Sequence, residues 1–154
     1  MNDLNLRRRV VREARLWIGT PYLHQASVRS QGADCLGLIR GVWRKCIASE
    51  PETVPEYTSD WGEVSTREDM LEASQRWFIP IDQDQALGGD LILFRWKNAT
   101  IVKHAGILTS PLRTKPSFIH AYEKAGVVET TLGHYWKSRV AACFRFPSQD
   151  LTGK

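Results

Sequence analysis

The chain has 154 residues, of which 42% are hydrophobic and 25% charged, with a formal net charge of +4. These values are typical of one globular domain, which we expect to cover residues 1–154. The three cysteines lie too far apart in the chain for a disulfide framework or a zinc ribbon. No apolar run has the length of a transmembrane helix, and the first residues lack the pattern of a secretory signal. We therefore expect cytoplasmic synthesis without a signal peptide, and no membrane partner.

The first segment has the apolar periodicity of an amphipathic helix that runs from Asp3, as its cap, to about Ile18, where Gly19 ends it. Five arginines lie between the apolar positions and are typical of a solvated helix face. A patch that attracts an anionic polymer is the weaker alternative. The chain has no recognised nucleic-acid reader motif, so we expect no nucleic-acid partner.

Residues 19–22, Gly-Thr-Pro-Tyr, predict a turn that leads into an extended segment ending near Arg29. Tyr22 precedes Cys35 by thirteen positions, so it could fold back beside the thiol. The alternative is a half-buried loop tyrosine with a hydrogen-bonded hydroxyl.

The stretch around Cys35 predicts a cysteine in the first turn of a buried helix. Apolar residues recur at helical spacing after it, and Asp34 is a good N-cap residue. The unpaired N–H groups of a helix start stabilise a thiolate, so we expect a lowered pKa for this thiol. Cys35 is therefore a candidate nucleophile, whereas Cys46 and Cys143 are typical of small buried hydrophobic residues.

A long connection, residues 48–85, follows this helix. Ala48–Val64 shows no periodicity, and Ser65–Glu68 has the pattern of a capping box that opens a helix to about Trp77 or Phe78. Because long connections in small domains are often functional, this one could be a lid, a specificity wall or a docking surface.

From Leu87 onward the pattern changes to short strands. A turn at Gly88–Asp90 precedes strands that we predict at residues 91–94, 104–109, 118–122, 127–129 and 140–146. Helices followed by an antiparallel meander predict an α+β fold. In this fold the N-terminal helices, with Cys35 at the start of one, pack on a C-terminal antiparallel β-sheet.

Two histidines fall on predicted strands, His104 at the beginning of one and His120 inside the next. If the strands are neighbours, Cys35 can meet both imidazoles, with His104 as general base and His120 holding its far ring nitrogen. Two alternatives stay open: each histidine could be structural, or the three residues could bind zinc with an open fourth position. His24 and His134 fall in loops or turns and receive no role.

The six tryptophans divide into two groups. Trp17, Trp43 and Trp77 fall on apolar helix faces and are expected in the core. The other three (Trp61, Trp96 and Trp136) are freer, and stacking on sugar rings is a weaker alternative for them.

Five short motifs occur here in the order seen in the NlpC-type cysteine peptidases. They are Gly19-Thr20-Pro21-Tyr22, Asp34-Cys35-Leu36-Gly37-Leu38, Gly89-Asp90-Leu91, His104-Ala105-Gly106-Ile107 and Phe118-Ile119-His120-Ala121. The chain resembles this papain-like family from about residue 8 to residue 147. Within the family it is most similar to the subgroup of phage tails and gene-transfer agents, through Arg40-Gly-Val-Trp43 and Phe144-Arg-Phe-Pro147.

The resemblance implies a peptidoglycan-cutting cysteine peptidase that needs no metal or organic cofactor. Cys35 matches the family nucleophile, His104 the base and His120 the third polar residue. Tyr22 matches a tyrosine whose hydroxyl lies near the thiol and helps to stabilise the oxyanion. Asp34 matches an acidic residue that can hold the amino group of the substrate.

The resulting hypothesis is an endopeptidase of peptidoglycan stem peptides that cuts between D-glutamate and the diamino acid. It would be carried in the virion or phage-like particle, at the tail tip beside a hub protein, to aid DNA entry. Leu36 replaces the serine of many relatives, which leaves open whether the substrate needs a free amino terminus. The alternatives are a tail-assembly module with a vestigial site, or an amidase or acyltransferase with the same thiol chemistry.

Overall fold

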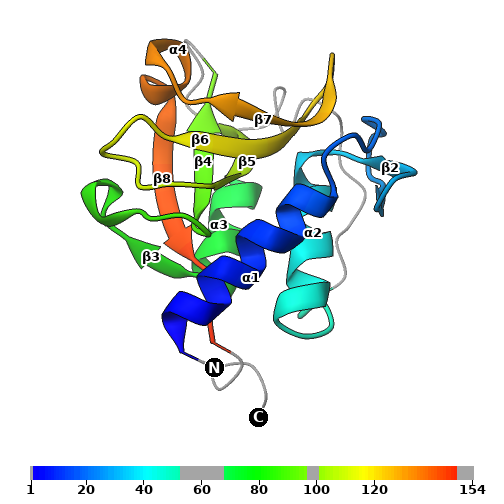
Figure 1. The fold of residues 1–154 in the computed structure, drawn as a ribbon, viewed down its shortest axis with the longest axis horizontal. Coiled ribbons are helices and arrows are strands. Elements are labelled where there is room, and N and C mark those ends of the chain that lie inside the picture. The colour runs from blue at the N-terminus through cyan, green and yellow to red at the C-terminus, as the bar shows by residue number, and fades with distance from the viewer. Residues whose placement is uncertain (1, 53–67, 97–100, 149–154) are drawn as a thin grey trace.

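The computed structural model describes residues 2–52, 68–96 and 101–148. The helices are α1 (Asp3–Leu16), α2 (Cys35–Cys46), α3 (Asp69–Trp77), the one-turn α4 (His134–Lys137) and the 3₁₀ turn η1 (Gln83–Gln85). The strands are β1 (Ser27–Val28), β2 (Gly32–Ala33), β3 (Ile79–Ile81), β4 (Leu91–Arg95), β5 (Val102–Leu108), β6 (Ser117–Tyr122), β7 (Gly126–Thr131) and β8 (Val140–Arg145). Helices α1, α2 and α3 pack on one face of a six-stranded antiparallel sheet (Figure 1), and the short helix α4 packs Trp136 on the other face.

The N-cap residue of helix α1 is Asn2, one residue before Asp3, the cap that the sequence predicts. The side chain of Asn2 accepts from the backbone N–H of Asn5 at 2.9 Å, whereas Asp3 pairs with Arg7 one turn further on. The helix ends at Leu16, and Gly19 adopts a φ of +95° in the turn that follows. In the described part of the chain, no helix is long and apolar enough to cross a bilayer.

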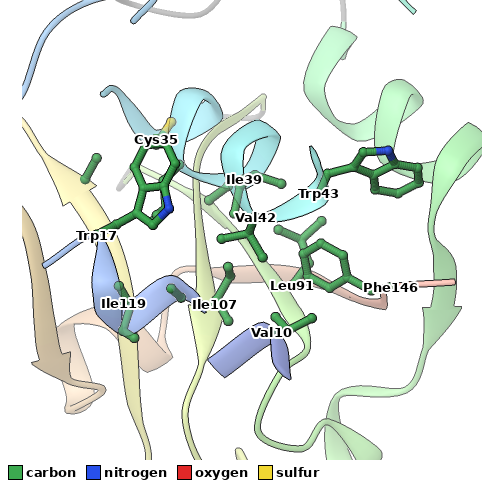
Figure 2. Packing of buried hydrophobic residues seen from close by; sticks show 14 of the residues in the cluster. Val10, Trp17, Cys35, Ile39, Val42, Trp43, Leu91, Ile107, Ile119 and Phe146 are labelled. Carbon is green, nitrogen blue, oxygen red and sulfur yellow. The ribbon is translucent and has the colours of Figure 1, made fainter. Parts of the chain in front are cut away.

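Helix α2 has the start and the N-cap that its sequence predicts. The Asp34 side chain accepts from the backbone N–H of Gly37, and eight of the helix's residues are buried. Its apolar face packs against α1 and against the inner face of the sheet (Figure 2). Gly41 lies so close to the Trp17 indole that a Cβ atom there would overlap the ring.

Helix α3 starts at Asp69, later than the predicted capping box. Glu68 is the N-cap residue but makes no side-chain cap. Its carboxylate instead accepts from the backbone N–H of Val102 at 2.7 Å and from the guanidinium of Arg95 at 3.1 Å. These two hydrogen bonds join the start of α3 to β5 and β4. Ser65, the other half of the predicted box, lies outside the described residues, as do residues 53–67 of the 48–85 connection.

The sheet has the strand order β3-β8-β4-β5-β6-β7. Strands β4 to β7 form the meander that the sequence predicts, and β8 returns to the other side of β4. The short edge strand β3 was not predicted. Pro80 lies at its centre, and Pro is tolerated in an edge strand where its missing N–H faces away from the ladder. The α+β fold, with the N-terminal helices on an antiparallel sheet, is therefore confirmed.

Candidate active site

The first residue of α2 is Cys35, so its sulfur lies at the helix N-terminus. Figure 2 shows this sulfur at the upper end of α2, above the strands on which the helix packs. The thiol is 4% exposed. The backbone N–H groups of Cys35, Leu36 and Ala105 all lie within hydrogen-bond reach of the sulfur. The helix start therefore supplies donors to the sulfur, as its sequence predicts, and β5 adds one from across the core.

A local separation of two strands allows this contact with β5. The pairing of β5 with β6 covers two residue pairs, Ile107 with Ile119 and Leu108 with Phe118, and stops before His104 and His120. An N–H group on the unpaired part of β5 is free of the ladder with β6 and can reach Cys35. Cys35 comes from the helix side of the sheet, and the two histidines come from the strands that separate.

His104 and His120 are buried and contact each other directly. Nε2 of His104 lies 2.7 Å from Nδ1 of His120, and Nε2 of His120 lies 2.9 Å from Oγ1 of Thr130. Three of the four ring nitrogens are thereby engaged. The remaining one is Nδ1 of His104. This nitrogen is the candidate acceptor of the Cys35 thiol proton, since both residues line the same pocket.

Aromatic rings enclose the two imidazoles. Trp96 stacks on His104 with ring centroids 5.3 Å apart, and Phe118 lies 4.2 Å from His120. Trp136 contacts both histidines, at 5.6 and 5.1 Å. The prediction that Trp136 is a freer residue is wrong, because α4 folds it down onto this cluster, where it is 9% exposed.

Burial decides the resting charge of these groups. It lowers the pKa of His104 well below 6.5, with a further contribution from His120, and lowers the pKa of His120 to about 4. Burial also raises the pKa of the Cys35 thiol to about 12, and the Asp34 charge adds to this rise. The direction is opposite to the expected lowering, because desolvation of a buried thiolate outweighs the N–H donors of the helix start. The resting site therefore holds a neutral thiol and neutral imidazoles.

Tyr22 lies beside the thiol, as the prediction requires. It bridges to Ala33 next to α2 and lines the same pocket of about 280 Å³ as Cys35 and His104. Burial raises the pKa of Tyr22 to about 12, and the charge of Cys35 when that thiol is ionised acts in the same direction, as do the carboxylates of Asp34 and Glu123. Its hydroxyl is consequently a hydrogen-bond donor at every pH at which the protein would work.

Asp34 is buried beneath the pocket instead of lining it. Its Oδ1 accepts from the N–H of Gly37 and its Oδ2 from the N–H of Gln25, both at 2.7 Å, and His24 lies 3.8 Å from Oδ2. The structure thus assigns Asp34 the capping role. Its predicted contact with a substrate amine stays a prediction.

The zinc alternative fits this geometry poorly. The two imidazole nitrogens that face each other share a hydrogen bond of 2.7 Å, and both would have to turn away to bind one ion at about 2.0 Å each. Over residues 2–52, 68–96 and 101–148, no group of three or more His, Cys, Asp or Glu side chains is arranged to hold a metal ion.

Several residues of the pocket were not predicted. Lys103, Lys124 and Tyr135 line it together with Trp96, and Thr130 contacts His120. Lys103 could have been found as the neighbour of His104. Thr130 could not, because its contact depends on the register between β6 and β7.

Comparisons with known proteins identify the family of the chain. The sequence model of the NlpC/P60 family matches residues 19–145. The chain is 29% identical over 145 residues to the gamma-DL-glutamyl hydrolase of Bacillus subtilis (strain 168), covering 92% of this chain and 30% of that protein. It is 29% identical over 122 residues to the probable endopeptidase NlpC of Escherichia coli (strain K12), covering 79% of this chain and 66% of that protein. The chain therefore spans less than two thirds of the length of each relative.

A solved NlpC/P60 family protein from Bacillus cereus ATCC 10987 has the same fold, with a TM-score of 0.64 over 91% of this chain and 40% of that one, at 17% identity. The family match covers the helix start at Cys35 and both histidine strands, which are the elements that build the pocket. With most of its length matched by the family model and the same fold in a solved member, the chain belongs to the NlpC/P60 family of cysteine peptidases.

Proposed function

We propose that the protein is a cysteine endopeptidase that hydrolyses peptide amide bonds in peptidoglycan stem peptides. The observation that carries the proposal is the joint placement of Cys35, His104 and His120. A thiol at a helix N-terminus shares a pocket with an imidazole whose far nitrogen is held by a second imidazole. Nucleophile, base and orienting group are the parts that thiol catalysis requires.

In this mechanism the reaction begins from the neutral pair. Nδ1 of neutral His104 takes the thiol proton as the Cys35 sulfur attacks the amide carbonyl. The developing oxyanion accepts from the Cys35 backbone N–H and from the protonated Tyr22 hydroxyl. His104 then gives its proton to the leaving amine, and a water molecule, activated by the same imidazole, releases the acyl group from the sulfur. Throughout these steps Nδ1 of His120 accepts from Nε2–H of His104, in both the neutral and the protonated form of the His104 ring.

The proposed scissile bond joins D-glutamate to the diamino acid. A relative named gamma-DL-glutamyl hydrolase supports a γ-glutamyl amide as the substrate. Lys103 and Lys124 lie in the wall of the pocket and suit the free carboxylates that such a peptide carries. In this proposal the amine-holding role of Asp34 applies only to substrates with a free amino terminus.

The test compares digestion of purified sacculi by wild type and by Cys35→Ala. We expect the variant to lose at least a thousandfold in rate, since no other group replaces the nucleophile. Cys143→Ala is the matched control, because it removes a buried thiol from the opposite face of the sheet. Equal digestion by wild type and Cys35→Ala would refute the proposal. Mass spectrometry of the released peptides identifies the bond, and added amines reveal an acyltransferase.

We further propose that the protein acts at the tip of a phage-like or gene-transfer-agent tail, bound to a hub protein. The similarity of its sequence motifs to that subgroup supports this location. Co-purification of the chain with assembled particles is the expected result, and its absence from particles produced by the same genome would contradict it.

A second candidate is a tail-assembly module with a vestigial site. The buried thiol with its raised pKa favours it, since structural cysteines are protonated and inert. Particles assembled with Cys35→Ala distinguish the two. Normal tails with impaired DNA entry support the enzyme, whereas normal tails with normal entry support the module.

A further inference from the structure

We propose that Thr130 is a positioning residue of this site: its hydroxyl accepts Nε2–H of His120 and thereby sets the direction of the hydrogen bond to His104. This inference rests on the proposed function, because it concerns the same base. It starts from the two consecutive contacts, 2.7 Å between the imidazoles and 2.9 Å between His120 and Thr130.

The register of two strands brings Thr130 to this place. In the β6–β7 ladder, His120 lies opposite Val128 and Phe118 lies opposite Thr130. Residues directly opposite each other share a face, so Thr130 is the diagonal neighbour of His120 on the face that carries both imidazoles. The Thr130 side chain is half-buried, so its own hydroxyl hydrogen can reach water while its oxygen faces the ring.

Only one direction of the hydrogen-bond chain leaves Nδ1 of His104 without a proton, so that this nitrogen can act as a base. A neutral imidazole carries one N–H, so the proton order runs one of two ways. If Thr130 accepts from Nε2–H of His120, then Nδ1 of His120 accepts from Nε2–H of His104, and Nδ1 of His104 keeps its lone pair for the thiol. If Thr130 donates to His120, every step reverses, and Nδ1 of His104 is already protonated. Burial keeps both rings neutral, so this choice exists at neutral pH.

The productive direction also suits the charged intermediate. When His104 has taken the thiol proton, its Nε2–H must still donate, and only a His120 with a bare Nδ1 can accept it. The His120 ring is then polarised, and its Nε2–H donates more strongly to the Thr130 oxygen. The Thr130 hydroxyl therefore acts through His120 and does not touch the substrate.

The first experiment measures ring-nitrogen protonation by ¹⁵N NMR of the labelled wild-type chain, and it needs no substrate. We expect both His104 and His120 to be protonated at Nε2 and bare at Nδ1 at pH 7. A His120 protonated at Nδ1 would overturn the inference, whatever the fate of the proposed function.

The second experiment compares Thr130→Val and Thr130→Ser on a soluble stem peptide that contains the D-glutamyl–diamino acid bond. Loss of this hydrogen bond should lower kcat about tenfold with little change in KM, and the serine variant should restore it. Thr131→Val is the matched control, because Thr131 is exposed on the same strand and faces away. If Cys35→Ala is inactive but Thr130→Val has the same kcat as Thr131→Val, the inference fails while the proposed function stands. If Cys35→Ala equals wild type, the proposed function fails and the NMR result alone decides.

Discussion

At the scale of single residues, Cys35 experiences two opposing effects. A helix N-terminus stabilises a nearby negative charge by about 0.3–1 kcal/mol, which is less than one pKa unit. A rise in the thiol pKa from 9.0 to about 12 corresponds to about 4 kcal/mol in the other direction. Burial is therefore the larger effect, and the thiol rests in its neutral form until a base takes its proton.

This balance predicts how Cys35 reacts with iodoacetamide. Because only a small fraction of the thiol is ionised below pH 12, the labelling rate should rise about tenfold for each pH unit between pH 7 and 10. Urea-denatured protein should instead level off near pH 9, at the ordinary thiol pKa. Intact-mass spectrometry of Cys35 labelling against time gives the rates. Fast labelling that is constant below pH 7 would show a thiolate–imidazolium pair and contradict this expectation.

At the scale of elements, contact between α1 and α2 depends on a missing side chain. Gly41 faces the Trp17 indole, whose N–H donates to Glu13 at 3.0 Å and is thereby held in place. Both Trp17 and its neighbours in α2 are buried, so the ring has little space to move. The two helices can therefore approach each other closely only with glycine at position 41.

Gly41→Ala should consequently destabilise the protein by about 1–3 kcal/mol, although alanine is the better helix former by about 1 kcal/mol. Urea unfolding followed by circular dichroism measures the change. Gly133→Ala is the control, since a Cβ there would meet nothing within 4 Å, and its effect should stay within about 0.5 kcal/mol. Equal or higher stability of Gly41→Ala would contradict this packing.

At the scale of the whole molecule, the two buried histidines link folding to pH. In the unfolded chain each has a pKa near 6.5, whereas in the folded protein the pKa of His120 is about 4 and that of His104 is well below 6.5. Between these values the unfolded state binds more protons than the folded state. The free energy of unfolding therefore falls as pH falls, and the stability present above pH 6.5 is lost toward pH 4.

For His120 alone this loss is about 3 kcal/mol between pH 7 and pH 4. Urea titrations at 25 °C over this range measure it. The double variant His104→Gln, His120→Gln should have a flatter pH dependence, whereas His134→Gln should match wild type because His134 is exposed. The same slope in the double variant and in wild type would show that other groups cause the acid sensitivity.

Local patterns accounted for much of the fold. The start and cap of α2, the apolar stripe of α1 and the β4–β7 meander follow from periodicity and turn residues within short windows. The wrong predictions concern residues whose contacts are with segments distant in the sequence. Glu68 bonds to β5 in preference to capping a helix, and Trp136 is folded onto the histidines by a one-turn helix that no periodicity marks.

By itself, the sequence determined the α+β class, the cysteine at a helix start and the two strands that carry His104 and His120, because each of these depends on residues that are neighbours in the chain. The tertiary structure decided three further properties. These are the hydrogen bond between the imidazoles, the contact of His120 with Thr130, and the neutral resting state of Cys35. The physical reason is that strand register and desolvation come from segments far apart in sequence, which meet only when the sheet and helices pack together.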